Sequence, residues 1–221
     1  MRDAITIALY SDVHCPYAYV TAYRLRKLQA EYRGKIRIAH KSLALEYVNK
    51  RSTPRGILME ETPIIMLEEP DIPYQPWSRP ESEWPVTMWS AFEAVKCAYQ
   101  QGDELAYELD WLIRKGFFEG SLCSLMHHVL FELAEGAGLD MARFEDDFLS
   151  GKFRRETYED ARAGWEQLRV EGSPTFVLPS GEQKSYFMLP KAKLDPSRNY
   201  RLTRVEPAEC MEGDCIEPYW A

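Results

Sequence analysis

A cysteine followed directly by a proline is the feature of this chain best suited to chemistry. Cys15 and Pro16 lie between an apolar run over residues 5–10 and a segment with helical spacing. Proline is favoured at the first position of a helix, because it has no N–H to leave unpaired there. The Cys15 sulfur would then face the free N–H groups and the positive dipole end of that helix, which stabilise a thiolate. Since the thiolate is the nucleophilic form of cysteine, we expect a pKa well below the ~8.5 of a free thiol.

A second motif lies near the other end of the chain. Residues 172–176 read Gly-Ser-Pro-Thr-Phe and open a pattern typical of a strand. Proline is tolerated at the first residue of a strand but not in its centre. Taken alone, Ser173-Pro174 is therefore an ordinary strand entry.

Strands and helices alternate around both motifs. The first motif is flanked by an apolar run, a helical segment and an alternating run, which predict a βαβ unit with two parallel strands. The second motif is followed by a tight turn and another short run, which predict a β-hairpin. The predicted strands cover residues 4–10, 35–43, 174–178 and 183–188, and the predicted flanking helices cover residues 16–32 and 152–170.

The middle of the chain differs from both ends. Prolines recur throughout residues 46–86 and exclude a long helix or a central strand there. An ordered loop of that length is usually functional, and this one could cover Cys15. Residues 86–150 follow helical spacing, with Asp140 as the N-cap of a helix over residues 141–149. The side chains of this region that could do chemistry are interpreted as structural: Cys97, Cys123, His127 and His128.

The two motifs and the order of elements resemble the DsbA family. The resemblance is to its FrnE-like branch, near the 2-hydroxychromene-2-carboxylate isomerases and the kappa-class glutathione transferases. It rests on Ser11-Asp12-Val13-His14-Cys15-Pro16-Tyr17-Ala18 and on Gly172-Ser173-Pro174-Thr175-Phe176. It implies an α/β protein with a thioredoxin-like fold and an inserted α-helical domain. The implied division is a discontinuous thioredoxin-like domain over 1–45 and 152–190, an insertion over 46–151, and a C-terminal tail over 191–221.

The resemblance also implies roles for individual residues. Cys15 would be the nucleophile and Pro16 would help to lower its pKa, while Pro174 would be a cis-proline that faces the sulfur. The backbone of Ser173 would hold an extended substrate or the cysteinyl part of glutathione. Further substrate contacts would come from His14, which could place charge beside the sulfur, from Tyr17 and from Thr175.

Position 18 departs from the family pattern. The family has a second cysteine there, whereas this chain has Ala18. In a Cys-x-x-Cys cycle the second thiol attacks the mixed disulfide formed by the first and releases the product. An alanine cannot do this. Three routes remain: an external thiol such as glutathione resolves the mixed disulfide, a tail cysteine (Cys210 or Cys215) does so, or the site binds its ligand without disulfide turnover.

The tail pair is open to more than one interpretation. Four residues, including Gly213, separate Cys210 from Cys215, and this spacing can close a disulfide. Some FrnE-like proteins carry a similar pair, so the resemblance suggests a second redox couple. Two free thiols are the alternative. A structural zinc site needs about four ligands and the tail offers two, so we expect no metal.

These features favour a thiol–disulfide oxidoreductase with a single active-site cysteine. The alternatives are a glutathione-dependent isomerase or transferase of a small aromatic compound, and a binding protein that has kept the fold without the reaction. For the isomerase, Tyr74, Trp77, Trp84 and Trp89 could line an apolar pocket. No tightly bound cofactor is expected. Glutathione is a candidate co-substrate, and the partners would be protein or small-molecule thiols and disulfides.

Composition limits the classes of partner and the cell compartment that we expect. The net charge of -8 argues against nucleic acids and anionic membranes as partners. The sequence lacks an apolar run long enough for a transmembrane helix and an N-terminal pattern typical of a signal peptide. Five cysteines in a chain of 221 residues do not suggest a secreted disulfide scaffold. We therefore expect a cytoplasmic monomer or homodimer.

Overall fold

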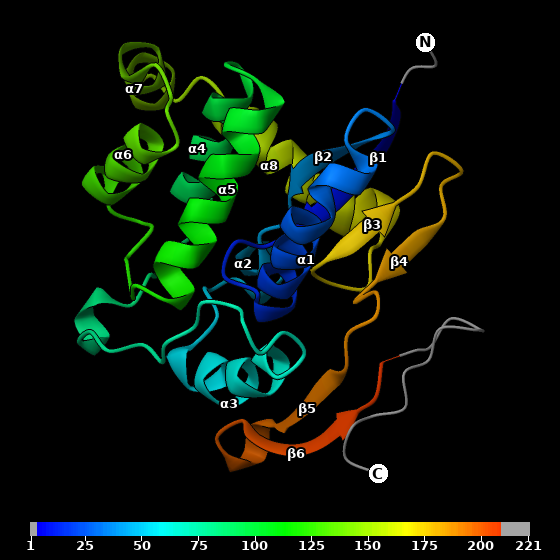
Figure 1. The fold of residues 1–221 in the computed structure, drawn as a ribbon. Coiled ribbons are helices and arrows are strands. Elements are labelled where there is room, and N and C mark those ends of the chain that lie inside the picture. Colours follow the sequence, from blue (N-terminus) through cyan, green and yellow to red (C-terminus); the bar gives the residue numbers. More distant parts are fainter. Residues whose placement is uncertain (1–3, 209–221) are drawn as a thin grey trace.

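A four-stranded sheet forms the centre of the protein in a computed structural model that describes residues 4–208. Its strand order is β2–β1–β3–β4, where β1 is Ile5–Ser11, β2 Ile36–Ser42, β3 Thr175–Val177 and β4 Gln183–Ser185. The strands β1 and β2 are parallel, while β3 is antiparallel to both β1 and β4. Helix α1, Pro16–Tyr32, connects β1 to β2, so the predicted βαβ unit and hairpin are confirmed (Figure 1).

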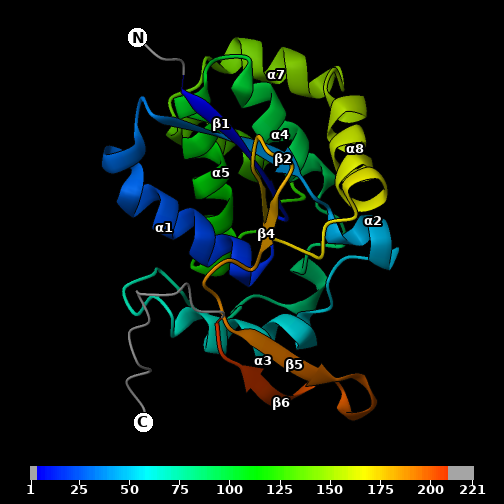
Figure 2. The same cartoon turned by 90° about the vertical axis from the view of Figure 1, so that its right-hand side faces the viewer.

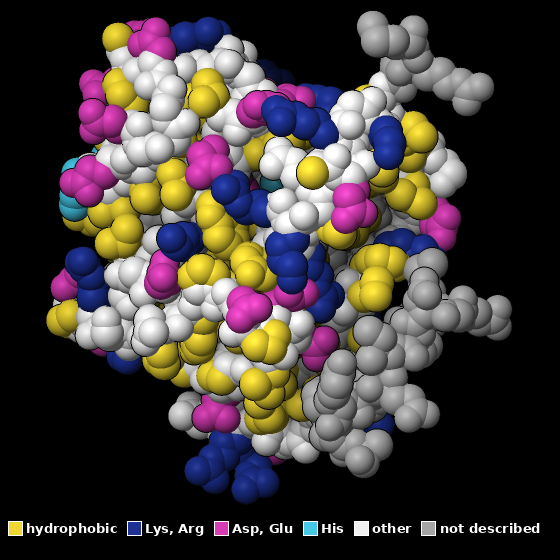
Figure 3. Space-filling model, viewed as in Figure 1, with side chains coloured by type: hydrophobic (Ala, Val, Ile, Leu, Met, Phe, Trp, Pro, Cys, Tyr) yellow, Lys and Arg dark blue, Asp and Glu magenta, His cyan; other side chains and the backbone are white. Residues whose placement is uncertain are grey.

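Helices cover both faces of this sheet. Figure 2 shows α1 on one side of the strands and α8, Arg154–Arg162, on the other. A π-helical turn, Ala163–Leu168, extends α8. The outer face of α1 is basic, and Figure 3 shows its positive side chains next to acidic ones. Arg24 and Lys27 both pair with Glu69, at 2.7 and 2.9 Å.

The insertion forms a block of helices beside the sheet (Figure 1). It contains α4 Trp89–Tyr99, α5 Asp103–Phe118, α6 His127–Gly136 and α7 Met141–Leu149. Asp140 caps α7 as predicted, since its carboxylate accepts a hydrogen bond from the Arg143 N–H at 3.2 Å. The α/β fold with a helical insertion is thus as expected.

The prediction that residues 46–86 contain no long helix is wrong. They include α3, Arg55–Met66, after the short α2, Leu45–Asn49. Pro63 lies inside α3 and removes one backbone hydrogen bond, at a typical cost of about 3 kcal/mol. The helix persists because its buried face packs into the core, and each fully buried apolar side chain contributes roughly 1.5–3 kcal/mol. Those residues are Leu58, Ile65 and Met66.

A second hairpin follows the sheet where the sequence indicated only a polar tail. Its strands are β5, Lys191–Asp195, and β6, Arg201–Glu206, joined through a 3₁₀ turn, Pro196–Arg198. Both figures of the fold place it against α3. The Leu202 N–H donates to the Glu60 carboxylate at 3.4 Å, which ties β6 to α3. Cys210 and Cys215 lie outside the described residues.

Two large clusters of buried side chains make up the core. One lies among the insertion helices and includes Cys97, which confirms that Cys97 is a core residue. The other lies between α1, α3 and α5 and includes Cys15. Trp77 and Trp84 belong to this second cluster, where both contact Phe117 at ring-centroid distances of 5.4 Å. They therefore pack the core and do not line an open pocket. No helix within residues 4–208 is long and apolar enough to span a membrane.

Candidate active site around Cys15

The fold brings the two sequence motifs into direct contact. Cys15 is the N-cap of α1 and Pro16 is its first residue, while the Ser173–Pro174 peptide bond is cis. The Cys15 thiol donates a hydrogen bond to the Ser173 carbonyl oxygen at 3.1 Å. Residues 158 positions apart in the chain thus form one site, in the arrangement that the resemblance implies.

The environment of the sulfur differs from the prediction. Cys15 is only 5 % exposed and packs in the cluster between α1 and α3. Burial raises the pKa of its thiol to about 12, and the Glu61 carboxylate adds to this effect. Interactions with Ser173 and the Ala18 backbone lower the pKa but do not compensate. The expected low thiol pKa is therefore wrong, because desolvation outweighs the helix N-terminus.

His14 does not place charge beside the sulfur. Its ring is buried, stacks on Phe117 at a centroid distance of 3.8 Å, and bonds the Ser124 hydroxyl through Nε2 at 2.6 Å. Burial lowers the pKa of His14 to about 3, with the Arg114 guanidinium contributing in the same direction. His14 is consequently a neutral packing residue, and the predicted charge beside the sulfur is wrong.

Asp12 joins the cysteine loop to the cis-proline loop. Its backbone N–H donates to the Ser173 hydroxyl at 2.8 Å. Its carboxylate accepts from the N–H groups of His14 and Leu45, both at 2.8 Å. Burial raises the pKa of Asp12 to about 6, against the effect of these two hydrogen bonds. A single residue therefore fixes the positions of Cys15, Ser173 and the start of α2.

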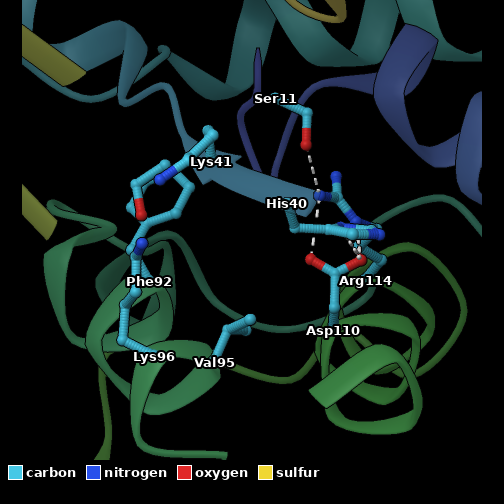
Figure 4. A pocket seen from close by; sticks show the side chains of 9 residues that line it. Ser11, His40, Lys41, Phe92, Val95, Lys96, Asp110 and Arg114 are labelled. Atoms are coloured by element: carbon cyan, nitrogen blue, oxygen red, sulfur yellow. Dashed lines mark hydrogen bonds and ion pairs between the residues drawn. The ribbon is translucent and has the colours of Figure 1, made fainter. Parts of the chain in front are cut away.

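Arg114 supports this loop from the helical insertion (Figure 4). Its guanidinium donates to the Asp12 carbonyl oxygen at 2.7 Å and to the Ser11 hydroxyl at 2.8 Å. It also pairs with Asp110 through two contacts of 2.8 and 3.0 Å. Arg114 is almost fully buried, and sequence analysis missed it. The available signal was a cation on the apolar side of a helix, next to Ile113 and Phe117.

Tyr17 links the site to α3 and to the C-terminal hairpin. Its hydroxyl accepts a hydrogen bond from the Ala192 N–H at 2.9 Å, and its ring meets Tyr186 edge-on at 5.2 Å. The Glu61 carboxylate lies beside this hydroxyl and acts on both Tyr17 and Cys15. Burial raises the pKa of Glu61 to about 7. Sequence analysis missed Glu61, because nothing in the proline-rich stretch singles it out.

The other groups predicted to contact the substrate, the Thr175 side chain and the Ser173 backbone, already form hydrogen bonds within the protein. The Thr175 hydroxyl donates to the Gly172 carbonyl oxygen at 2.6 Å and also bonds Ser185 at 2.6 Å. The Ser173 carbonyl is occupied by Cys15 itself. Residues 4–208 hold no group of three or more His, Cys, Asp and Glu side chains placed to bind a metal.

Comparisons with known proteins concern the family and the fold of the chain. A family model described as thioredoxin matches residues 9–189. A probable DsbA oxidoreductase from Streptomyces coelicolor is 22% identical, with a TM-score of 0.65 over 82% of this chain and 83% of that one. The cytosolic disulfide reductase DsbM from Pseudomonas aeruginosa is 19% identical, with a TM-score of 0.68 over 89% and 92%. A 2-hydroxychromene-2-carboxylate isomerase is 17% identical, with a TM-score of 0.61 over 82% and 88%. No curated protein matches the chain.

These results establish both the fold and the family. The structural matches share the fold of this chain. The family match spans most of the chain and includes both Cys15 and Pro174. The chain therefore belongs to the thioredoxin family.

Proposed function

We propose that this protein is a thiol–disulfide oxidoreductase with a single active-site cysteine, Cys15. The observation that carries the proposal is the contact of the Cys15 sulfur with the backbone beside the cis-proline. A substrate that displaces the thiol from the Ser173 carbonyl would place its own backbone N–H there. Its disulfide would then lie next to the nucleophile. Ala18 limits the reaction at this site to a single sulfur.

The first step is a thiol–disulfide exchange. The Cys15 sulfur attacks one sulfur of a disulfide, the S–S bond breaks, and a mixed disulfide forms while the other sulfur leaves as a thiolate. Because Cys15 is a buried neutral thiol, its proton needs an acceptor. Glu61 is that acceptor, since its carboxylate acts on the sulfur and its pKa of about 7 lies in the physiological range. The proton then passes from Glu61 to the leaving thiolate.

The second step requires another sulfur. We infer that an external thiol, such as glutathione, or a tail cysteine attacks the mixed disulfide. Glu206, the last residue of β6, pairs with Lys191, and the neighbouring Ala192 bonds Tyr17, so the described hairpin contacts the site. Cys210 follows Glu206 by four residues, which reach at most about 14 Å. We therefore keep both resolving routes in the proposal.

The substrate that suits the site is a small or extended disulfide. Cys15 is too deeply buried to meet a folded protein surface in this state. DsbM has been solved with GSH, which makes glutathione a reasonable partner for this chain as well. DsbM is also described as cytosolic, and we place this protein in the cytoplasm by the same analogy.

The first test is disulfide mapping by mass spectrometry after treatment with oxidised glutathione. We expect one glutathione adduct on Cys15, or a bridge from Cys15 to Cys210 or Cys215 if the tail resolves the adduct. Cys97 serves as an internal control, because it is fully buried and should stay unmodified. The Cys15→Ser variant should form no adduct at position 15. A wild-type protein whose Cys15 never reacts would contradict the proposal.

The same preparations separate the alternative functions. Turnover of a chromene carboxylic acid with glutathione, without disulfide exchange, would favour the isomerase. Glutathione binding that survives Cys15→Ser, with neither activity, would favour a binding protein.

The role of Glu61 predicts a specific pH dependence. In the wild-type protein, the rate of adduct formation at Cys15 should rise with pH and level off above pH 7, as the carboxylate becomes able to accept a proton. In Glu61→Gln this inflection should disappear, and the rate at pH 8 should fall by roughly tenfold or more.

Glu60→Gln is the matched control on the same helix. Glu60 contacts the hairpin rather than the sulfur, so this variant should keep the wild-type profile. An unchanged inflection in Glu61→Gln would rule out the assigned role, even if the rate itself fell.

A further inference from the structure

A concave site lies in the helical insertion, built from residues that the proposed function does not use. It is a cavity of about 240 Å³ between α4, α6, α7 and α8. Such a volume is below the ~300–1,000 Å³ of sites for drug-sized ligands, so it suits a smaller molecule. Glu93, Phe148 and Thr157 are its buried lining residues, while His127 and Arg154 are exposed at its opening.

Glu93, a buried lining residue of the cavity, has an incompletely bonded carboxylate. Glu93 is only 4 % exposed, and its Oε2 accepts a hydrogen bond from Arg154 Nε at 3.0 Å. Its Oε1 is buried and has no hydrogen-bond donor within residues 4–208. A buried acceptor without a partner costs free energy, which a ligand with an N–H donor would recover.

The charges and the walls of the cavity define the ligand further. Glu93 and Arg154 carry opposite charges, so a ligand with one charge of each sign can pair with both. Trp89 and Phe148 supply aromatic walls, and the His127 ring meets Phe148 edge-on at 5.0 Å. These aromatic walls would contact an apolar side chain of the ligand, and also the methylene group or ring next to the ligand's ammonium group.

We propose that this cavity binds a small zwitterionic amino acid with an apolar side chain. The ligand's ammonium group donates to Glu93, its carboxylate pairs with Arg154 at the opening, and its side chain packs against Trp89 and Phe148. The Glu93–Arg154 ion pair is then replaced by two pairs with the ligand. The site is separate from the Cys15 site, with which it shares no lining residue.

The proposal is tested with L-phenylalanine as the probe, by titration calorimetry and by the fluorescence change of the tryptophans. We expect saturable binding at millimolar or lower concentration. Phenethylamine lacks the carboxylate and 3-phenylpropionate lacks the ammonium group, so each should bind about tenfold more weakly or worse. Glu93→Gln and Arg154→Met should each weaken L-phenylalanine binding to a similar extent.

Arg155→Met is the control, because Arg155 neighbours Arg154 on α8 and does not line the cavity. The affinity of Arg155→Met for L-phenylalanine should match that of the wild-type protein. Arg154 is mostly exposed, so Arg154→Met should fold even if Glu93→Gln does not. No binding at millimolar concentration, equal binding of the three probes, or unchanged affinity in Arg154→Met would each overturn the proposal. None of these outcomes bears on Cys15.

Discussion

Arg114→Met is expected to lower the free energy of unfolding by about 3–5 kcal/mol, which is the usual effect of removing one partner of a buried ion pair. The variant would leave the Asp110 carboxylate in the core without its main partner. It would also remove the donors that hold the Asp12 carbonyl and the Ser11 hydroxyl. Chemical denaturation followed by circular dichroism measures the change. Since single domains are stable by only about 5–15 kcal/mol, much of the margin would be lost.

Lys115→Met provides the comparison from the next position of α5. Lys115 is about two-fifths exposed and pairs with Glu119 at 3.4 Å, an arrangement worth about 0–1 kcal/mol. A loss in Arg114→Met no larger than the loss in Lys115→Met would show that Arg114 does not anchor the loop.

Ala18→Cys is expected to convert the single-cysteine site into a self-resolving one. Position 15 is the N-cap of α1 and position 18 lies in its first turn, where Ala18 is buried in the same cluster as Cys15. Residues three apart on a helix are neighbours, at a Cα separation within the ~4.4–6.8 Å that disulfides span. The new thiol should therefore attack a mixed disulfide on Cys15 and close a disulfide bridge between positions 15 and 18.

The measurement begins with the purified Cys15–glutathione adduct, free of added thiol. Cys210 and Cys215 are replaced by serine throughout, so that the tail cannot contribute. Release of glutathione should be at least about a hundredfold faster with Ala18→Cys than in the parent, because the attack becomes intramolecular. Ala22→Cys is the control, since seven helical residues place it about 10 Å away along the axis. Equal release from all three proteins would contradict the proposed site geometry.

The parts of the site that could be predicted are those with local signals. Proline at the first helical position located the start of α1, and Asp140 marked the start of α7, because capping depends on adjacent residues. The partnership of Cys15 with Pro174 came from the family resemblance. By contrast, the absence of a helix in the proline-rich stretch was wrong, because tertiary packing of α3 overrides the effect of Pro63.

What could not be predicted depends on contacts between distant segments. Burial against Phe117 keeps the His14 ring neutral, and the residues next to His14 in the sequence do not indicate that contact. Glu61 raises the pKa of Cys15 only because the fold packs α3 against α1. The low thiol pKa was inferred from a helix terminus, a local feature, whereas the desolvation that outweighs it is a property of the whole fold.

The burial of Cys15 also has a consequence for chemical durability. Peroxides oxidise thiolates first, and a thiolate that is exposed proceeds through sulfenic to irreversible sulfinic and sulfonic acids. A sulfur that is kept protonated, shielded from water and bonded to a carbonyl is protected from that sequence between turnovers. The slow intrinsic reactivity of such a thiol therefore also protects it from irreversible oxidation. Because position 18 is not a cysteine, a sulfenic acid on Cys15 cannot be trapped there as a disulfide. Burial of the sulfur then gives the protection that a neighbouring thiol would otherwise provide.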